Sequence, residues 1–277
     1  MEPKNAAIHR VTKTLLIVSG GAQAASAASR ARALGHTVVV SDSDPQAPAF
    51  AFADSCLIAD ANGAVETAAA AERYNRKIRK IDGVLCLADY ALAAAAVTDR
   101  LRLPGIPMHV AELASDRLAI KRSFQSAGIP TPWHAEISTP QELQRVVIAR
   151  GRAVTIMPVE NLGSHGRQLM SDVEDPAAAF QQTREASPSQ RMLVELAPDG
   201  EHLMLDCWME NGACQVAGTT DSMAKDIAGR AVSALGISDG PAVCEIVMHL
   251  GAPQVMGIAA RAGGEAFLDR AIAAALG

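Results

Sequence analysis

The segment 158–169 (PVENLGSHGRQL) carries residue types that suit phosphate binding. It follows a short apolar run and places Ser164 and His165 between two glycines, Gly163 and Gly166. Glycine permits backbone conformations in which successive N–H groups turn toward an anion, so the stretch is typical of a flexible turn over phosphates. An ordinary surface hairpin would use the same residues, with His165 in solvent, and the segment alone does not separate these two interpretations.

A second candidate site is built around Glu245, which lies in an apolar run. A turn at Gly251 would fold this run back onto 254–261 and set Glu245 opposite Gly257. Ala259 would then share a face with Gly257, because side chains alternate along a strand. Carboxylates are ligands for hard cations such as Mg²⁺, so Glu245 is a candidate metal ligand.

The cysteines do not predict a metal site or a disulfide framework. They are dispersed, odd in number and without CxxC spacing, which is typical of reduced, buried thiols in a cytosolic protein. The five are Cys56, Cys86, Cys207, Cys214 and Cys244.

Composition narrows the function classes. The chain has 277 residues, 49% hydrophobic and 20% charged, which is enough for two globular domains. A net charge of −5 argues against nucleic-acid binding, which needs a basic surface. Neither a run of 18 apolar residues nor the apolar core of a secretory signal occurs, so we expect a cytoplasmic protein without a membrane span.

The elements that would position these residues begin with a strand over 14–19 and a glycine turn at Gly20 and Gly21. A helix to residue 34 and a second strand over 37–41 follow, and strands and helices then alternate for about a hundred residues. This pattern predicts an α/β domain with a doubly wound parallel sheet. A dinucleotide-binding protein is an alternative, since Asp42 follows the second strand, but the glycine turn lacks the G-x-G-x-x-G spacing.

The remainder of the chain has a different character. Helices are predicted over 116–127, 140–149 and 224–235, and the dipeptide Asn211-Gly212 between apolar runs signals a hairpin. The C-terminal part therefore reads as α+β with antiparallel strands, and the whole chain as α/β plus α+β.

Five segments, in this order, resemble the ATP-grasp superfamily, in particular its carboxylate–amine ligase branch and relatives such as biotin carboxylase and carbamoyl-phosphate synthetase. They are 42–48 (DSDPQAP), 116–132, the turn 163–166, 194–196 with 200–201, and 244–245 with 260–264 (ARAGG). The resemblance covers nearly the whole chain. It implies a pre-ATP-grasp, Rossmann-like domain over 1–111 and an ATP-grasp domain over 112–277, made of subdomains 112–190 and 191–277.

In that family, ATP bound with Mg²⁺ activates a carboxylate as an acyl phosphate, and a nucleophile, often an amine, then displaces the phosphate. The resemblance implies ATP or ADP as the ligand, with Glu245 toward the metal and Arg261 as the catalytic residue at the phosphates. Glu195 and Leu196 match the adenine hinge, and Glu201 matches the ribose-binding acid. The implied nucleotide-binding residues are Arg117, Gly163, Ser164, His165, Gly166, Glu195, Leu196 and Glu201.

Several positions depart from the family pattern. Met157 stands where a phosphate-binding lysine is usual, and Gly257 and Ala259 stand where a glutamate and an asparagine hold metal. Arg117 replaces a lysine but keeps its charge. With Glu245 as the remaining carboxylate, the two-Mg²⁺ site of the family cannot be assembled from these positions, and the ATP-grasp part is also shorter than usual.

Two functions are consistent with these residues. The first is an ATP-grasp-fold protein that binds a nucleotide and has weak or lost ligase activity. The alternative is an active ATP-dependent carboxylate–amine (C–N) ligase acting on an unknown small carboxylate or amine. Its substitute ligands would be Glu265, Asp269 or Asp239 for the metal and Lys121 or Arg167 for the missing lysine. The alanine-rich helices are apolar and so are compatible with a homodimer or with binding of a protein partner.

Overall fold

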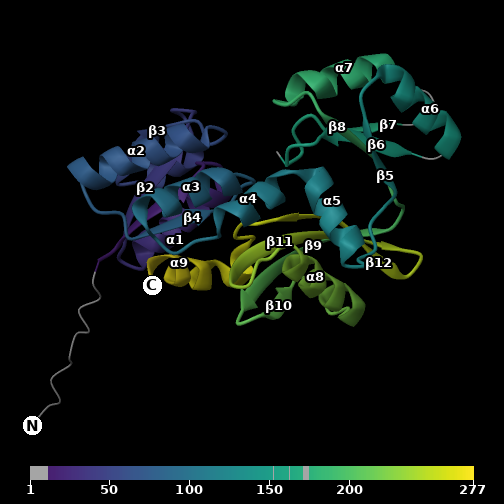
Figure 1. Cartoon of the computed structure of the whole chain (residues 1–277). Coiled ribbons are helices and arrows are strands. Elements are labelled where there is room, and N and C mark those ends of the chain that lie inside the picture. Colours follow the sequence, from purple (N-terminus) through teal and green to yellow (C-terminus); the bar gives the residue numbers. More distant parts are fainter. Residues whose placement is uncertain (1–11, 152, 162, 171–174) are drawn as a thin grey trace, which may run out of the picture.

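The structure is a computed structural model that describes residues 12–151, 153–161, 163–170 and 175–277. It contains one parallel and two antiparallel sheets, each covered by helices (Figure 1). Leu162 of the predicted phosphate turn lies outside the described residues. Within the described ranges, no helix is both long and apolar enough to cross a membrane.

The N-terminal sheet, here called the parallel sheet, has the strand order β3-β2-β1-β4 with all neighbours parallel. Its strands are β1 (Thr14–Val18), β2 (Thr37–Asp42), β3 (Ser55–Ile58) and β4 (Gly83–Cys86). The continuous apolar runs of β1 and β2 place them at the centre, where both faces are buried. The predicted doubly wound parallel sheet is confirmed.

Helices cover both faces of the parallel sheet. Leu15 and Ile17 pack against one pair of helices, whereas Leu16 faces the other side. The first pair is α1 (Ala22–Ala33) and α9 (Leu268–Leu276), and the second is α2 (Ala64–Lys77) and α3 (Ala91–Leu101). Figure 1 shows α9 beside α1, so the C-terminal helix returns to the N-terminal sheet. A short 3₁₀ helix, η1 (Pro48–Phe52), packs against α1.

Two consecutive helices connect the N-terminal part to the antiparallel sheets. These are α4 (Met108–Ser115) and α5 (Arg117–Ser126), joined at Asp116. The Asp116 carboxylate caps α5 by accepting a hydrogen bond from the backbone N–H of Ala119 at 2.8 Å. The domain boundary predicted at 111/112 falls inside α4, so the helix is shared between the two parts.

The small sheet is antiparallel, with the order β5-β8-β6-β7. Its strands are β5 (His134–Ile137), β6 (Val154–Pro158), β7 (Gln168–Met170) and β8 (Met192–Leu196), and its helices are α6 (Pro140–Arg150) and α7 (Pro176–Ala186). Both helices pack on the face that carries Ile156 and Val194. Met157 and Leu193 lie on the other face of this sheet, which lines the cleft. β8 pairs with β5 and β6, although it follows the subdomain division predicted at residue 190.

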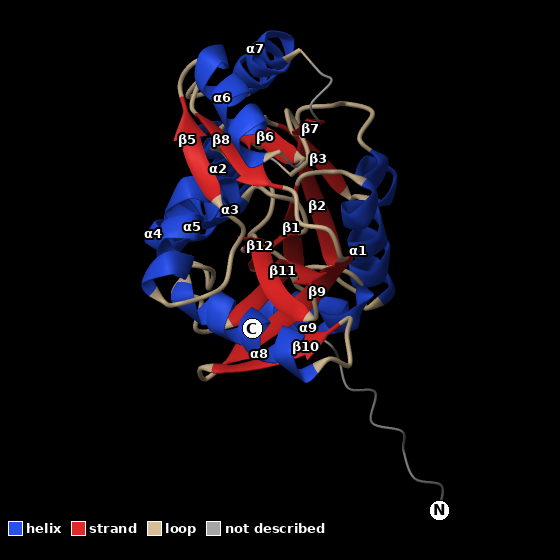
Figure 2. Ribbon diagram, turned by 90° about the vertical axis from the view of Figure 1, so that its right-hand side faces the viewer, coloured by secondary structure: helices blue, strands red, loops and turns tan. Residues whose placement is uncertain are grey.

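The large sheet is also antiparallel, with the order β10-β9-β11-β12. Its strands are β9 (Glu201–Glu210), β10 (Ala213–Ala217), β11 (Gly240–His249) and β12 (Ala252–Ala259). The helix α8 (Ser222–Ala234) covers one face, and the short 3₁₀ helix η2 (Glu265–Phe267) follows β12 in the chain. The predicted turn at Asn211 and Gly212 is confirmed, with positive φ at both residues. Leu205, Cys207 and Cys244 pack beneath α8. The opposite face points to the small sheet (Figure 2).

Candidate functional site

A cavity of about 310 Å³ lies where the small sheet, the large sheet and the end of β4 meet. We call it the arginine cavity, because three guanidinium groups line it. Its lining residues are Asp89, Arg117, Asn161, Gly163, Ser164, Arg167, Met204, Val243, Glu245, Gly257, Ile258, Ala259 and Arg261. Segments far apart in the sequence therefore meet here, including residues predicted from the glycine turn and from the β11–β12 hairpin.

Arg117 is held at the first position of α5. Its Nη2 donates a hydrogen bond to the carbonyl oxygen of Gly163 at 2.6 Å, which ties α5 to the glycine turn. Burial and the nearby charge of Arg167 hold the pKa of Arg117 below its ordinary value. A half-buried arginine that remains charged beside another arginine creates a positive potential that favours an anion.

Arg261 and Arg167 approach the same space from other directions. The Nε of Arg261 lies 3.0 Å from a carboxylate oxygen of Asp89, and its side chain is 13% exposed. Arg167 reaches two carboxylates with its terminal nitrogens, Glu245 at 3.6 Å and Glu195 at 3.7 Å. These last two distances exceed those of good hydrogen bonds, so Arg167 is attracted to both carboxylates but bound tightly to neither.

The predicted pairing of Glu245 with Gly257 in the β11–β12 hairpin is confirmed, and a β-bulge between Glu245 and Ile246 shifts the register by one residue. Glu245 lies directly opposite Gly257, and Val243 lies opposite Ala259, on the face that lines the arginine cavity. A Cβ added at Gly257 would meet nothing within 4 Å, so a side chain there has space in front of it. Position 257, where the family pattern implies a glutamate, therefore faces open space among the described residues.

The residues present do not fit a resident Mg²⁺. Three guanidinium groups face two carboxylates, Glu245 and Asp89, which leaves the arginine cavity with one net positive charge. Each carboxylate is already close to an arginine, and Mg²⁺ prefers several anionic or neutral oxygens. Among the described residues no group of three or more His, Cys, Asp or Glu side chains converges as a metal site.

A buried ion pair borders the arginine cavity. Lys121 of α5 and Glu195 of β8 meet at 2.9 Å, with side chains only 2% and 3% exposed. The Nζ of Lys121 also donates to the hydroxyl of Thr131 at 2.8 Å. Glu195 Oε2 makes no well-aligned hydrogen bond, so charge attraction rather than hydrogen-bond geometry joins it to Lys121. The side chain of Leu196, by contrast, packs against the core under α6 and α7.

The glycine turn is anchored from the side of α7. Gly166 has a φ of 71°, and its carbonyl oxygen accepts a hydrogen bond from Thr183 at 3.1 Å. Burial would raise the pKa of Glu160, but hydrogen bonds from Ser189 and Ser187 outweigh it and hold this pKa below its ordinary value.

The structure brings together only part of the predicted site. Arg117, Gly163, Ser164, Glu245 and Arg261 all line the arginine cavity. Glu195 borders it through Arg167. His165 and Glu201 are exposed and line none of the cavities at the cleft, and Glu201 lies at the start of β9 opposite Met248.

Of the residues proposed as substitute phosphate and metal ligands, some lie at the cleft and others do not. Lys121 lines the same small compartment as Met157, whereas Arg167 lines the adjoining arginine cavity. Asp269 forms an ion pair with Arg30 at 2.5 Å, far from this cleft in the fold. Neither Glu265 nor Asp239 lines the arginine cavity. Asp239 lines a neighbouring, mostly apolar cavity of about 420 Å³ beside β4, which Arg261 also lines.

Two residues of the cleft were not among the predicted nucleotide or metal ligands. Asp89 follows β4, where ligands of open parallel sheets collect, and this position is a usable sequence signal. Asn161 donates to the carbonyl oxygens of Ala114 and Ile258, each at 3.2 Å, and so joins the loop after β6 to α4 and β12. No local pattern marks Asn161, because its partners are distant in the sequence.

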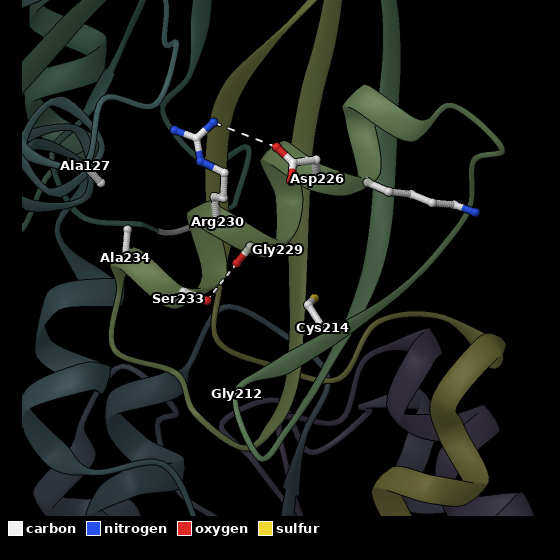
Figure 3. A pocket seen from close by; sticks show the side chains of 9 residues that line it. Ala127, Gly212, Cys214, Asp226, Gly229, Arg230, Ser233 and Ala234 are labelled. Atoms are coloured by element: carbon white, nitrogen blue, oxygen red, sulfur yellow. Dashed lines mark hydrogen bonds and ion pairs between the residues drawn. The ribbon is translucent and has the colours of Figure 1, made fainter.

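A wider hollow of about 610 Å³ lies between α8 and β10 (Figure 3). Figure 3 shows Arg230 turned toward Asp226, an ion pair at 3.8 Å along α8. The hydroxyl of Ser233 donates to the carbonyl of Gly229 at 3.0 Å. Several polar groups here thus bind one another in an open surface, and the hollow lacks the converging charges of the arginine cavity.

Comparison with known proteins identifies the fold. No protein-family model and no curated protein sequence matches the chain. An L-amino acid ligase from Bacillus licheniformis is similar in structure, with a TM-score of 0.72 at 20% identity over 90% of this chain and 67% of that one.

Two further structures are N5-carboxyaminoimidazole synthetase from Staphylococcus aureus complexed with ADP and biotin carboxylase from Campylobacter jejuni in a β,γ-ATP complex. Their TM-scores are 0.74 and 0.70, both at 16% identity and over 96% of this chain, covering 77% and 71% of theirs. The predicted architecture, a pre-ATP-grasp domain followed by an ATP-grasp domain, is thereby confirmed.

Proposed function

We propose that this chain uses its ATP-grasp fold to hold a nucleotide by its phosphates in the arginine cavity, with ligase activity weak or lost. The observation that carries the proposal is the convergence of Arg117, Arg167 and Arg261 on one cavity with a net positive charge. One guanidinium group can donate two parallel hydrogen bonds to the oxygens of a phosphate. Three guanidinium groups can therefore neutralise much of the charge of a polyphosphate chain. The ADP and ATP complexes of the similar structures support a nucleotide as the ligand.

The weak or lost activity is inferred from the residues around the phosphates. Formation of an acyl phosphate requires neutralisation of charge that develops during phosphoryl transfer. Met157 is buried and apolar where the family has a lysine, and Gly257 and Ala259 offer no metal ligand. Arg167 can supply a positive charge, but Asp89, the other carboxylate of the cavity, is paired with Arg261 at 3.0 Å.

Isothermal titration calorimetry with ATP and with ADP, each with Mg²⁺ and with EDTA, tests the proposal. We expect heat from both nucleotides and affinities that change by less than about threefold on removal of Mg²⁺, because the cavity neutralises phosphates with arginines. Arg117→Met should weaken both nucleotides by about tenfold or more, from the loss of charge-assisted hydrogen bonds. The absence of both a heat signal and a thermal shift with millimolar ATP would contradict nucleotide binding.

An active ligase is the second candidate, and the position of Asp89 favours it. Asp89 and Glu245 both line the arginine cavity, and two carboxylates together with substrate phosphates are sufficient for one Mg²⁺ in many enzymes. Both would have to leave their arginines to do so. ADP release from ATP with panels of small carboxylates and amines tests this reading. Release that requires one such pair and disappears in Glu245→Ala would replace the proposal of lost activity.

A further inference from the structure

The cleft has a second compartment next to the arginine cavity, and this compartment is almost filled. It shares Arg117, Asn161, Gly257 and Ile258 with the arginine cavity but contains only about 10 Å³ of space. A buried water needs at least about that volume. A phosphate chain thus has a compartment of about 310 Å³, whereas a planar ring has no room in the adjoining compartment.

Side chains from both sheets close this second compartment. Met157 and Leu193 of the small sheet are 1% and 0% exposed and face Met256 of the large sheet. Lys121 and Glu195 complete the wall with their ion pair. A ring could enter only by separating two buried charges or by moving well-packed apolar groups, and both changes oppose binding.

The arginine cavity, in contrast, is ready for an anion. Arg167 is 27% exposed and lies 3.6 and 3.7 Å from its two carboxylates, so it can turn to a phosphate without losing a short hydrogen bond. Arg261 keeps Asp89 through Nε and directs Nη1 to the carbonyl of Ala262, at 3.1 Å. The three guanidinium groups that can reach an anion therefore line the arginine cavity, whereas the charges of Lys121 and Glu195 in the second compartment are paired with each other.

We propose that the cleft recognises the phosphate chain of its ligand and not the base, so that Lys121 and Glu195 act as specificity-determining residues that exclude a ring. The proposal rests on the proposed function, because it assigns the ligand class of the same cavity. Inorganic tripolyphosphate, ATP and GTP should then bind with similar affinity, and adenosine should not bind.

The test is calorimetry of the full chain with tripolyphosphate, ATP, GTP and adenosine, without Mg²⁺ and at about 0.15 M salt to limit nonspecific attraction. We expect tripolyphosphate and GTP within about threefold of ATP, and no heat from adenosine. ATP that binds at least about tenfold more tightly than both tripolyphosphate and GTP, or measurable binding of adenosine, would overturn the proposal while leaving nucleotide binding intact. Absence of binding by all four compounds would refute both proposals.

Two variants separate site binding from general charge attraction. Arg117→Met should weaken tripolyphosphate and ATP by the same factor, about tenfold or more. Arg122→Met removes an equal charge from an exposed position on the same helix and should leave both affinities unchanged. Equal losses in the two variants would show attraction to the overall charge of the protein and would contradict a phosphate site in the arginine cavity.

Discussion

Removal of Lys121 provides a quantitative test of how the cleft is held together. In Lys121→Met the carboxylate of Glu195 would stay 3% exposed and lose its 2.9 Å partner. Arg167, at 3.7 Å, is too distant to replace that contact fully. Breaking a buried ion pair from one side costs about 3–5 kcal/mol, because a desolvated charge is left without compensation.

The double variant Lys121→Met/Glu195→Met removes both charges at similar volume. Replacement of a buried pair by apolar groups is often neutral or stabilising, so we expect the free energy of unfolding to recover to within about 1 kcal/mol of wild type. Chemical denaturation measures both variants. The melting temperature of the single variant should fall by at least about 6 °C, at roughly 2 °C per kcal/mol for a chain of this size.

The matched control is Arg30→Met, which breaks the ion pair with Asp269. That pair is about half exposed, with side chains 47% and 59% accessible, so no resolvable change is expected. The reasoning is refuted if Lys121→Met destabilises no more than this control. It is equally refuted if the double variant is as unstable as the single one, since the cost would then not come from an uncompensated charge.

Three further changes test other parts of the account. Gly257→Glu with Ala259→Asn places new oxygen ligands on two residues that line the arginine cavity, and a Cβ at position 257 meets nothing within 4 Å. ATP binding should therefore become stronger with Mg²⁺ than with EDTA, which calorimetry measures. The depressed pKa of Glu160 means that its contribution to stability is complete at neutral pH and is lost as the pH falls below the ordinary glutamate pKa of about 4.3. Thermal melts from pH 6 to pH 3 should therefore show a smaller acid-induced loss in Glu160→Gln. Gly83→Ala would bring a Cβ to 2.1 Å from the carbonyl oxygen of Ala275, so it should destabilise the docking of α9 by about 1–3 kcal/mol, measured by denaturation.

Each of these changes has a control that isolates its cause. Adding Glu245→Ala to the two cleft substitutions should abolish the new Mg²⁺ dependence, and its persistence would contradict metal binding beside β11. Glu185→Gln, at an exposed position of α7, should leave the loss of thermal stability between pH 6 and pH 3 unchanged. Gly21→Ala adds a Cβ that meets nothing within 4 Å, so a loss equal to that of Gly83→Ala would argue against the steric explanation.

Local signals in the sequence predict the fold, and half of the predicted site residues line the arginine cavity. Glu245 lies opposite Gly257 as predicted, but the turn alone does not set this pairing. His249 pairs with Ala252 at the turn, and a β-bulge between Glu245 and Ile246 adds the one-residue shift. Alternating apolar runs and glycine turns predict the parallel sheet. In these cases the determining interactions lie within a few residues of one another.

The remaining features depend on contacts between distant segments. Lys121 follows the pattern of an amphipathic helix next to Arg122, and nothing local distinguishes the buried cation from the exposed one. β8 joins the small sheet because β5 and β6 flank it in space, a pairing that periodicity does not specify. The short β5 and the alanine-rich α7 were not predicted, since four residues or a mixed polar run carry a weak signal.

The proposed phosphate site of this cleft consists of Arg117, Arg167 and Arg261. A crystal structure with a non-hydrolysable ATP analogue tests it most directly. We expect electron density for the phosphate chain between Arg117, Arg167 and Arg261, with the guanidinium of Arg167 turned away from Glu195. Density for the nucleotide at another surface, such as the hollow between α8 and β10, with the arginine cavity unchanged, would contradict it.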